Sequence, residues 1–159
     1  MNENFWIITI FILSIIAFIP IAIEATSTEP LTEEQKTQEL NNYIHKLINK
    51  ERTENGRQPL TLNSQLTQLA IKHSKQMEKD QLMYHSSNNI EENVARIPQA
   101  TNTIGCGNTR TTQSIADCVV QQWMDSYGHK QNLLTKTHTT TGIHAQCDNE
   151  NCWITQNFR

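Results

Sequence analysis

The sequence predicts an α+β domain, because amphipathic helices occupy the first half of the chain and strand-like segments close it. Apolar residues recur at helical spacing over residues 33–55 and again over residues 64–82. Near the end, residues 139–143 and 153–158 are rich in β-branched and aromatic side chains and flank a short polar turn. Helices first and strands late indicate an α+β fold. The 159 residues are enough for about one domain.

Residues 1–25 are expected to lie outside that domain. Residues 5–23 form a run of nineteen uncharged residues, most of them apolar, which is close to the roughly 20 that cross a bilayer core as a helix. The run also fits a secretory signal peptide, although Glu3 stands where such peptides carry basic residues, and Ile23 is bulky for a cleavage after Ala25. A cleaved signal peptide and a retained membrane anchor both stay open. Either one makes the domain extracellular or anchored on the outer side of the cell membrane.

The chain without this segment is nearly neutral. Removing residues 1–25 removes two of the 16 acidic residues and none of the 13 basic ones, which leaves 14 against 13. Such a chain has no positive field to attract nucleic acid or anionic lipid. We therefore expect no nucleic-acid partner, and membrane association only through residues 5–23 if they are retained. The domain itself is expected to be a monomer.

The four cysteines, Cys106, Cys118, Cys147 and Cys152, all lie in the C-terminal third. In an exported chain an even number of cysteines predicts disulfides. Sequential pairing is favoured, because the residues between Cys147 and Cys152 have the composition of a hairpin turn that would bring the two sulfurs together. The alternative is a zinc site of His144, Cys147 and Cys152, although their spacing matches no common zinc pattern.

Residues 26–37 are interpreted as a polar linker and the start of the first helix. Thr32 and Gln35 have the spacing of a capping box, which predicts that the helix begins there. Gly56 is a natural C-cap, and Pro59 prevents the helix from continuing. Its apolar stripe is formed by Leu40, Ile44, Leu47 and Ile48.

A brief extended link, residues 60–62, leads to the second helix, which Asn63 or Ser64 caps and which runs to about Leu82. One face of this helix carries Leu66, Leu69, Ala70, His73 and Met77. His73 is expected to be a partly buried helix residue rather than a ligand.

The middle of the chain is predicted to be mostly loop. Residues 82–89 are polar apart from their start, and residues 90–95 are a short amphipathic piece that predicts one helical turn. Residues 96–112 are rich in Thr, Asn and Gly, which indicates a loop with room for a short strand around Ile104. A third helix is then expected to begin at Ser114 and to end at Gly128. Its apolar face consists of Ile115, Val119, Val120 and Trp123.

His129 is the centre of the candidate site. It follows Gly128, and Trp123, Leu133 and Leu134 are expected to pack around it and hold its ring in place. The other candidates for a shared cleft are His85, Glu91, Glu92 and His144. Two histidines and a carboxylate suit a divalent cation or general acid–base chemistry. The spacing of these residues alone favours a structural role, since many chains with six histidines offer similar sets.

The sequence lacks the usual hydrolase signatures. There is no Gly-x-Ser-x-Gly elbow, no phosphate-binding glycine loop and no His-Glu-x-x-His pair. Cysteines used in disulfides leave no thiol nucleophile.

Six motifs, taken in order, resemble the CAP superfamily (the SCP domain of cysteine-rich secretory, antigen 5 and pathogenesis-related 1 proteins), and most closely its short prokaryotic branch. Together they cover about residues 38–159. The motifs are residues 48–60, residues 66–77, His85 with Ser86, residues 92–95, residues 123–134, and residues 142–143 with 153–158.

This resemblance implies a three-layer α-β-α sandwich with a central antiparallel sheet. It also implies a cleft lined by two histidines and two acids, where some members bind zinc or another divalent cation. His85, Glu92 and His129 carry over to that cleft, as candidate metal ligands or catalytic residues. The second acid does not, because its position holds Ser126, and the neighbouring Asp125 would point differently on a helix. Glu91 replaces a common glycine and is a candidate for a compensating carboxylate.

We expect a secreted or membrane-tethered binding module for a lipid, a cell-envelope component or a partner protein. Its cleft would offer a modest site for Zn²⁺ or another divalent cation. One alternative is a metal-assisted hydrolase, with a water activated between His85 and His129 and with Glu92 as base. The other is a disulfide-stabilised structural domain. A fold alone does not decide between them.

Overall fold

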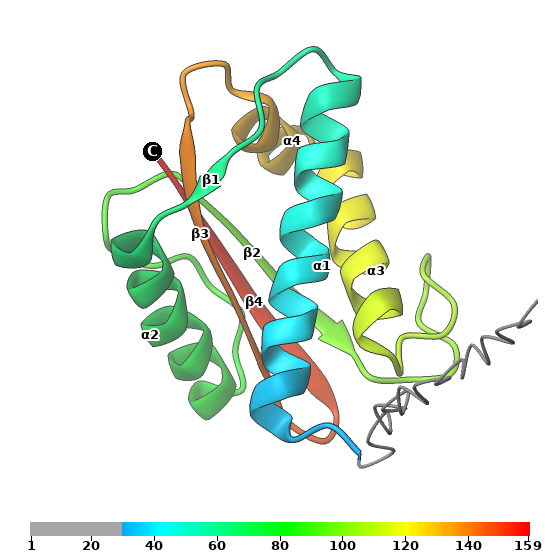
Figure 1. Ribbon diagram of the computed structural model, residues 1–159. Coiled ribbons are helices and arrows are strands. Elements are labelled where there is room, and N and C mark those ends of the chain that lie inside the picture. Colours follow the sequence, from blue (N-terminus) through cyan, green and yellow to red (C-terminus); the bar gives the residue numbers. More distant parts are fainter. Residues whose placement is uncertain (1–29) are drawn as a thin grey trace, which may run out of the picture. The chain divides into compact units, whose positions relative to one another are not determined.

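A computed structural model of the protein describes residues 30–159, which form four helices and four strands (Figure 1). The predicted signal peptide or anchor, residues 1–25, lies outside the described residues. Across residues 30–159, none of the helices combines the length and the apolar character that crossing a bilayer requires.

A four-stranded sheet lies at the centre, in the order β1-β3-β4-β2. Strands β3 (Thr140–Cys147) and β4 (Asn151–Phe158) form the predicted hairpin, which is longer than expected, and β2 (Glu92–Pro98) pairs antiparallel with β4. The two-residue β1 (Thr61–Leu62) pairs parallel with β3 at one edge. The predicted α+β class and the antiparallel central sheet are confirmed.

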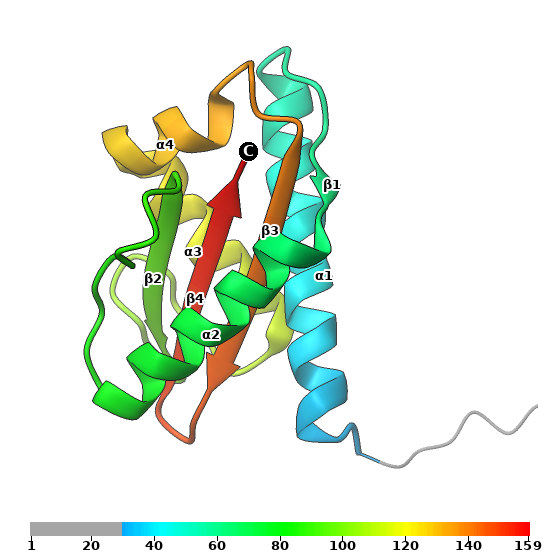
Figure 2. The ribbon, with the colours of Figure 1, turned by 90° about the vertical axis from the view of Figure 1, so that its left-hand side faces the viewer.

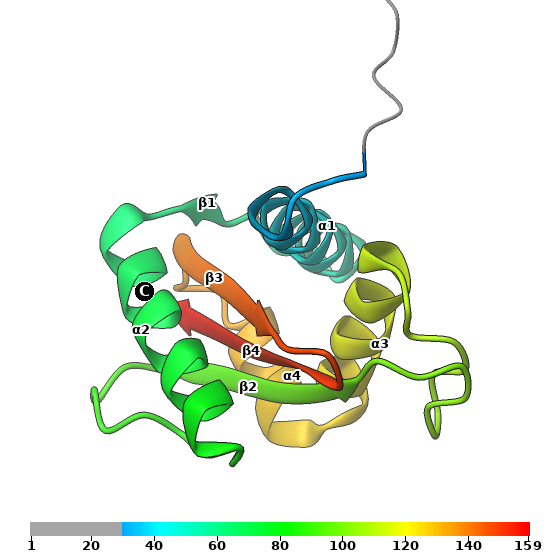
Figure 3. The same ribbon diagram turned by 90° about the horizontal axis from the view of Figure 1, so that it is seen from below.

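Helices cover both faces of this sheet. Helix α2 (Ser64–Asp80) lies across one face, while α1 (Glu33–Glu54), α3 (Thr112–Asp125) and α4 (Tyr127–Leu134) lie on the other (Figures 2 and 3). The arrangement is the expected α-β-α sandwich.

The main core lies between the sheet and the layer of α1, α3 and α4. The predicted apolar faces of α1 and α3 are buried there, including Leu40, Ile44, Val119 and Trp123. A smaller cluster of Met77, Val94 and Trp153 lies under α2. The predicted capping box at the start of α1 is present as well, since Thr32 and Gln35 bond reciprocally.

One buried cation ties α1 to the far side of the domain. The Arg52 side chain is fully buried and donates hydrogen bonds to four carbonyl oxygens. One belongs to the chain just after α1, and the other three belong to the end of α4 and to the connection that follows it. These acceptors are the carbonyls of Gln58, Leu133, Thr135 and His138.

The predicted helical turn at residues 90–95 is wrong. From Glu92 onward this segment is β2, paired with β4 over seven residues, and it continues through Arg96 to Pro98. A short amphipathic segment of six residues fits helical and extended periodicity almost equally. This segment is a strand because it pairs with β4.

The boundaries of α3 also differ from the prediction. Thr111 is the N-cap, and Ser114 is its partner in a second capping box. The helix ends at Asp125, because Ser126 has an extended backbone (φ −93°, ψ 123°). Gly128 does not end the helix; it lies inside α4.

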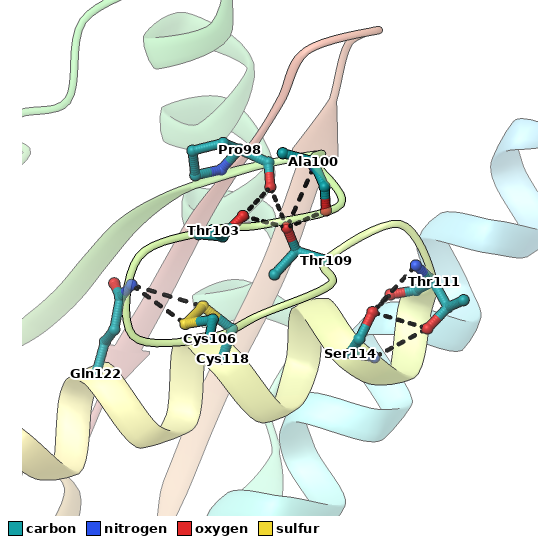
Figure 4. Close-up of a disulfide and its surroundings, with 9 residues drawn as sticks. All are labelled: Pro98, Ala100, Thr103, Cys106, Thr109, Thr111, Ser114, Cys118 and Gln122. Carbon is teal, nitrogen blue, oxygen red and sulfur yellow. Dashed lines mark hydrogen bonds between the residues drawn. A yellow bond between two sulfur atoms is a disulfide. The ribbon is translucent and has the colours of Figure 1, made fainter.

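Both predicted disulfides are present, Cys106–Cys118 and Cys147–Cys152. The alternative zinc site with His144 is therefore wrong, because both of its cysteines are oxidised. Figure 4 shows how Cys106–Cys118 attaches the loop between β2 and α3 to the helix, with Gln122 donating to both sulfurs. In place of the expected short strand around Ile104, a single bridge joins Thr103 and Gly107, and Ile104 itself is 96% exposed at the tip.

Gly142 sets the spacing between α2 and the sheet. A Cβ atom on this residue of β3 would lie 2.1 Å from the Leu66 carbonyl carbon and 2.1 Å from the Thr67 nitrogen. Both are backbone atoms of α2, so neither can move without shifting the helix. Close approach of α2 to the sheet therefore requires glycine here.

Gly142→Ala is expected to lower the free energy of unfolding by about 3 kcal/mol or more, because the new methyl group overlaps helix backbone. Chemical denaturation of the purified protein measures the change. Gly128→Ala is the matched control: its Cβ would meet nothing within 4 Å, and alanine inside a helix gains up to about 1 kcal/mol. Equal stability of the two variants would contradict the proposed contact.

Candidate functional site

Glu92 and His85 form the first half of the candidate cleft. Glu92, the first residue of β2, is buried, and its Oε1 accepts hydrogen bonds from the Ser86 backbone N–H (2.9 Å) and from His85 Nδ1 (3.0 Å). A carboxylate only accepts, so Nδ1 of His85 carries the hydrogen. In the neutral ring this leaves a lone pair on Nε2. The His85 side chain is 58% exposed, so that ring is accessible.

His129 on α4 forms the second half. Its ring centroid lies 6.2 Å from that of His85, with the two rings tilted by 38°. Burial lowers the pKa of His129, and the neighbouring His85 lowers it further by repulsion. The structure thus brings together the three residues carried over from the sequence: His85 and His129 lie side by side, and Glu92 lies behind His85.

Helix α4 is held in place by two asparagines that the sequence analysis did not single out, and α3 by Trp123, which it did. Asn93 donates to the backbone carbonyl of His129 (3.1 Å), and Asn132 donates to the carbonyl of Glu92 (3.2 Å) and to Oδ1 of Asn93 (3.0 Å). Trp123 on α3 donates from its indole to the carbonyl of Val94 (3.0 Å). These bonds connect α3 and α4 directly to β2, and so fix His129 relative to Glu92.

Glu91 does not act as the compensating carboxylate that the sequence suggested. Its carboxylate pairs with Nε2 of His138, whose Nδ1 bonds the carbonyl of Asn132 (3.0 Å) and whose ring stacks on Phe158 at 5.0 Å. His138 was not a candidate in the sequence because nothing in its surroundings of Thr and Lys marks it as buried.

His144 also lies apart from His85 and His129. It sits on β3 beneath α2, where its Nδ1 bonds the Ser74 hydroxyl at 2.7 Å. His73, predicted to be a partly buried helix residue, is buried on α2 and bonds the carbonyl of Tyr84. Its Nε2 lies 3.9 Å from Glu92 Oε1, a proximity that helical periodicity could not reveal.

Within the described part of the chain, a full set of metal ligands is not assembled around His85 and His129. Ser126 joins α3 to α4, and the neighbouring Asp125 is exposed. Within residues 30–159, no group of three or more His, Cys, Asp or Glu side chains is arranged to hold a metal ion. Zinc in proteins takes four ligands, at least three of them usually from protein side chains. The two histidines therefore supply only part of such a site.

Comparison with protein families gives one match. The profile of the cysteine-rich secretory protein family (CAP) matches residues 45–158, well over half of the chain. Among curated proteins, none matches the chain.

Several solved structures share the fold. An extracellular protein containing an SCP domain from Bacillus anthracis is 22% identical, with a TM-score of 0.57 over 82% of this chain and 44% of its own. An outer surface protein from Borrelia burgdorferi is 14% identical, with a TM-score of 0.54 over 77% of this chain and 93% of its own. NaASP2, solved with Zn²⁺, is 11% identical, with a TM-score of 0.50 over 83% and 82%. At these identities the likeness shows the fold alone, and this chain spans less than half the length of the Bacillus protein.

His144 makes the stability of the domain depend on pH. Burial lowers its pKa from 6.5 to about 4, with repulsion from Lys75 as a second cause. His144 therefore becomes protonated near pH 6.5 in the unfolded chain but only near pH 4 in the folded chain. This contribution to stability is present above pH 6.5 and is lost as the pH falls toward 4, and it amounts to on the order of 3 kcal/mol.

We expect urea unfolding at pH 7, 6 and 5 to show this loss in the unaltered protein, and a flatter dependence in His144→Gln. Glutamine can accept from Ser74 without titrating, so the gap in stability between the two proteins should narrow as the pH falls. Parallel pH profiles would show that His144 is not the group responsible.

Proposed function

We propose that this chain is an extracellular binding module that works through the pair His85 and His129. The chain belongs to the cysteine-rich secretory protein family, as its motifs predicted. The apolar run at residues 5–23 supports export, as do the two disulfides, which persist in oxidising compartments.

One observation carries the proposal: Glu92 orients His85. Glu92 accepts a hydrogen bond from Nδ1–H of His85, so in the neutral ring the lone pair on Nε2 is available on the other side. The lowered pKa of His129 favours the neutral form of that ring. The cleft thus presents two imidazoles that accept hydrogen bonds or coordinate a cation.

The ligand chemistry follows from these two acceptors. A group with N–H or O–H donors, such as the head of an envelope lipid, a glycan or a peptide, fits them directly. Met83 is exposed two residues before His85, and Tyr127 is exposed at the start of α4; they provide apolar surface in the same two segments for a ligand or partner protein.

A divalent cation such as Zn²⁺ fits only if groups other than these side chains complete its coordination. His85 and His129 would supply two ligands, with Glu92 supporting His85 from behind, and the ligand or solvent would complete the coordination. NaASP2, a protein of the same fold, was solved with Zn²⁺. Metal-assisted hydrolysis is less well supported, because Glu92 Oε1 is already bonded to His85 and Ser86 and its Oε2 is buried.

Removal of the histidine pair tests the cation. We expect Zn²⁺ to bind the purified protein measurably in isothermal titration calorimetry, and His85→Ala plus His129→Ala to abolish that binding. Glu92→Gln should weaken it by about 10–100-fold, since residues that orient a ligating histidine have effects of this size.

His45→Ala is the matched control, because His45 lies on α1 and bonds the carbonyl of Leu60; its Zn²⁺ affinity should equal that of the unaltered protein. Melting temperatures measured without metal separate binding from folding. Unchanged Zn²⁺ binding in the double variant would end the cation hypothesis. Failure of the pure domain to retain any member of a panel of lipids, glycans and envelope extract would end the binding-module hypothesis.

A further inference from the structure

Three buried polar atoms on the α2 side of the sheet have no hydrogen-bond partner within residues 30–159. They are Oε2 of Glu92, Oγ1 of Thr155 and Oδ1 of Asn157. The Glu92 side chain is 3% exposed, and Thr155 and Asn157 are 0% and 1% exposed. Buried polar atoms in folded proteins are rarely left unpaired, so each of the three requires an explanation.

The register of the sheet places these side chains on one face. Asn157 donates from Nδ2 to the carbonyl of Leu66 on α2 (3.3 Å), and Trp153 packs in the cluster beneath the same helix. Alternate residues of a strand share a face, so Thr155, which lies between them, also points toward α2. Glu92 is the direct partner of Asn157 in the β2–β4 pairing, and directly opposed side chains are near neighbours.

The orientations of the two acceptors are fixed by their other bonds. Rotating the Asn157 amide would turn its oxygen toward the Leu66 carbonyl, and two acceptors cannot bond each other. For Glu92, the bonds from Ser86 and His85 hold Oε1 on the loop side. Oδ1 and Oε2 therefore both remain in the interior, turned away from these partners.

Helix α2 carries a small residue over this part of the sheet. Ala70 is fully buried, one turn after Leu66, which contacts Asn157, and one turn before Ser74, which bonds His144. His144 is the direct partner of Thr155 in the β3–β4 pairing. Ala70 thus lies on the helix between the contacts that flank Thr155 and Asn157, and its methyl group leaves more room above them than a longer side chain would.

We propose that one internal water molecule binds at this place and satisfies all three atoms. It accepts a hydrogen bond from the Thr155 hydroxyl and donates one each to Oε2 of Glu92 and Oδ1 of Asn157. Three hydrogen bonds are typical of buried water. A hard metal cation fits poorly, because it takes about six or more oxygen ligands. The fourth such atom within residues 30–159 is Oε1 of Gln156, whose side chain bonds Thr141 on the opposite face, and it takes no part.

The water makes Thr155 and Asn157 positioning residues for the cleft. It holds Oε2 of Glu92 in the interior, which keeps Oε1 on His85 and Ser86. His85 is then held as the Nδ1–H tautomer by a chain of bonds that runs from the centre of the sheet to the surface. This role does not depend on which ligand the cleft binds.

A crystal structure of the purified protein at a resolution that shows ordered water tests the site directly. We expect a single density peak within about 3 Å of Oε2 of Glu92, Oγ1 of Thr155 and Oδ1 of Asn157. A dry interior, or direct hydrogen bonds among the three side chains, would overturn the proposal. This measurement needs no variant, so it stands even if a substitution prevents folding.

The positioning role is tested with Thr155→Val and Thr155→Ser. Valine removes the hydroxyl at nearly constant volume, and we expect loss of the water peak and a shift of the His85 ¹⁵N resonances from the Nδ1–H pattern toward a mixture of tautomers. Serine keeps the hydroxyl and should restore both the water and the pattern of the unaltered protein. Identical His85 spectra in the valine variant and the unaltered protein would show that Thr155 does not position the cleft.

Discussion

The alternation of side chains at the start of β2 organises the whole site. Glu92 points to the α2 face, where it holds His85 and the backbone of Ser86, while Asn93 points to the other face, where it holds the backbone of His129. Two consecutive residues thus connect the α2–β2 loop to α4 through a single strand. The same alternation explains Glu91: it shares the side of Asn93 and meets His138, so it cannot add a second carboxylate beside Glu92.

A second constraint keeps α4 in reach of that strand. Among residues 30–159 the buried Arg52 has no carboxylate partner, and burial together with the nearby Arg57 lowers its pKa. A buried charge requires compensating hydrogen bonds, and here backbone carbonyls provide them. Three of these carbonyls, those of Leu133, Thr135 and His138, lie between the last turn of α4 and the start of β3. The Arg52 cation therefore fixes the course of the chain between these two elements. The position of His129 therefore depends on α1, which contributes none of the three candidate residues His85, Glu92 and His129.

Local signals in the sequence were sufficient for much of the fold. The predicted bounds of α1, residues 33–55, agree with the structure to within one residue at the C-terminal end. The capping box of Thr32 with Gln35 marked its start, and the long periodic stripe from Leu40 to Ile48 allowed only a helix. The turn between Cys147 and Cys152 likewise predicted the hairpin and its disulfide. Short segments failed. Residues 90–95 carry too few apolar positions to fix a period. The break between α3 and α4 falls at Ser126 rather than at Gly128, because the packing of both helices on β2 sets its position.

The candidate site shows the same division between sequence and tertiary structure. Motif order made His85, Glu92 and His129 candidates, but could not predict which oxygen of Glu92 faces which neighbour. That detail bears on function. For Glu92 to act directly as a base, Oε1 would have to leave two hydrogen bonds, and the buried carboxylate would lose about 1–3 kcal/mol for each. Keeping them leaves the rings of His85 and His129 as the basic groups of the site, with Glu92 as the group that orients His85. Any proton transfer at this site would then run through the histidine rings. In its neutral form His85 has its one N–H already bonded to Glu92, so this ring offers a ligand an acceptor and no donor.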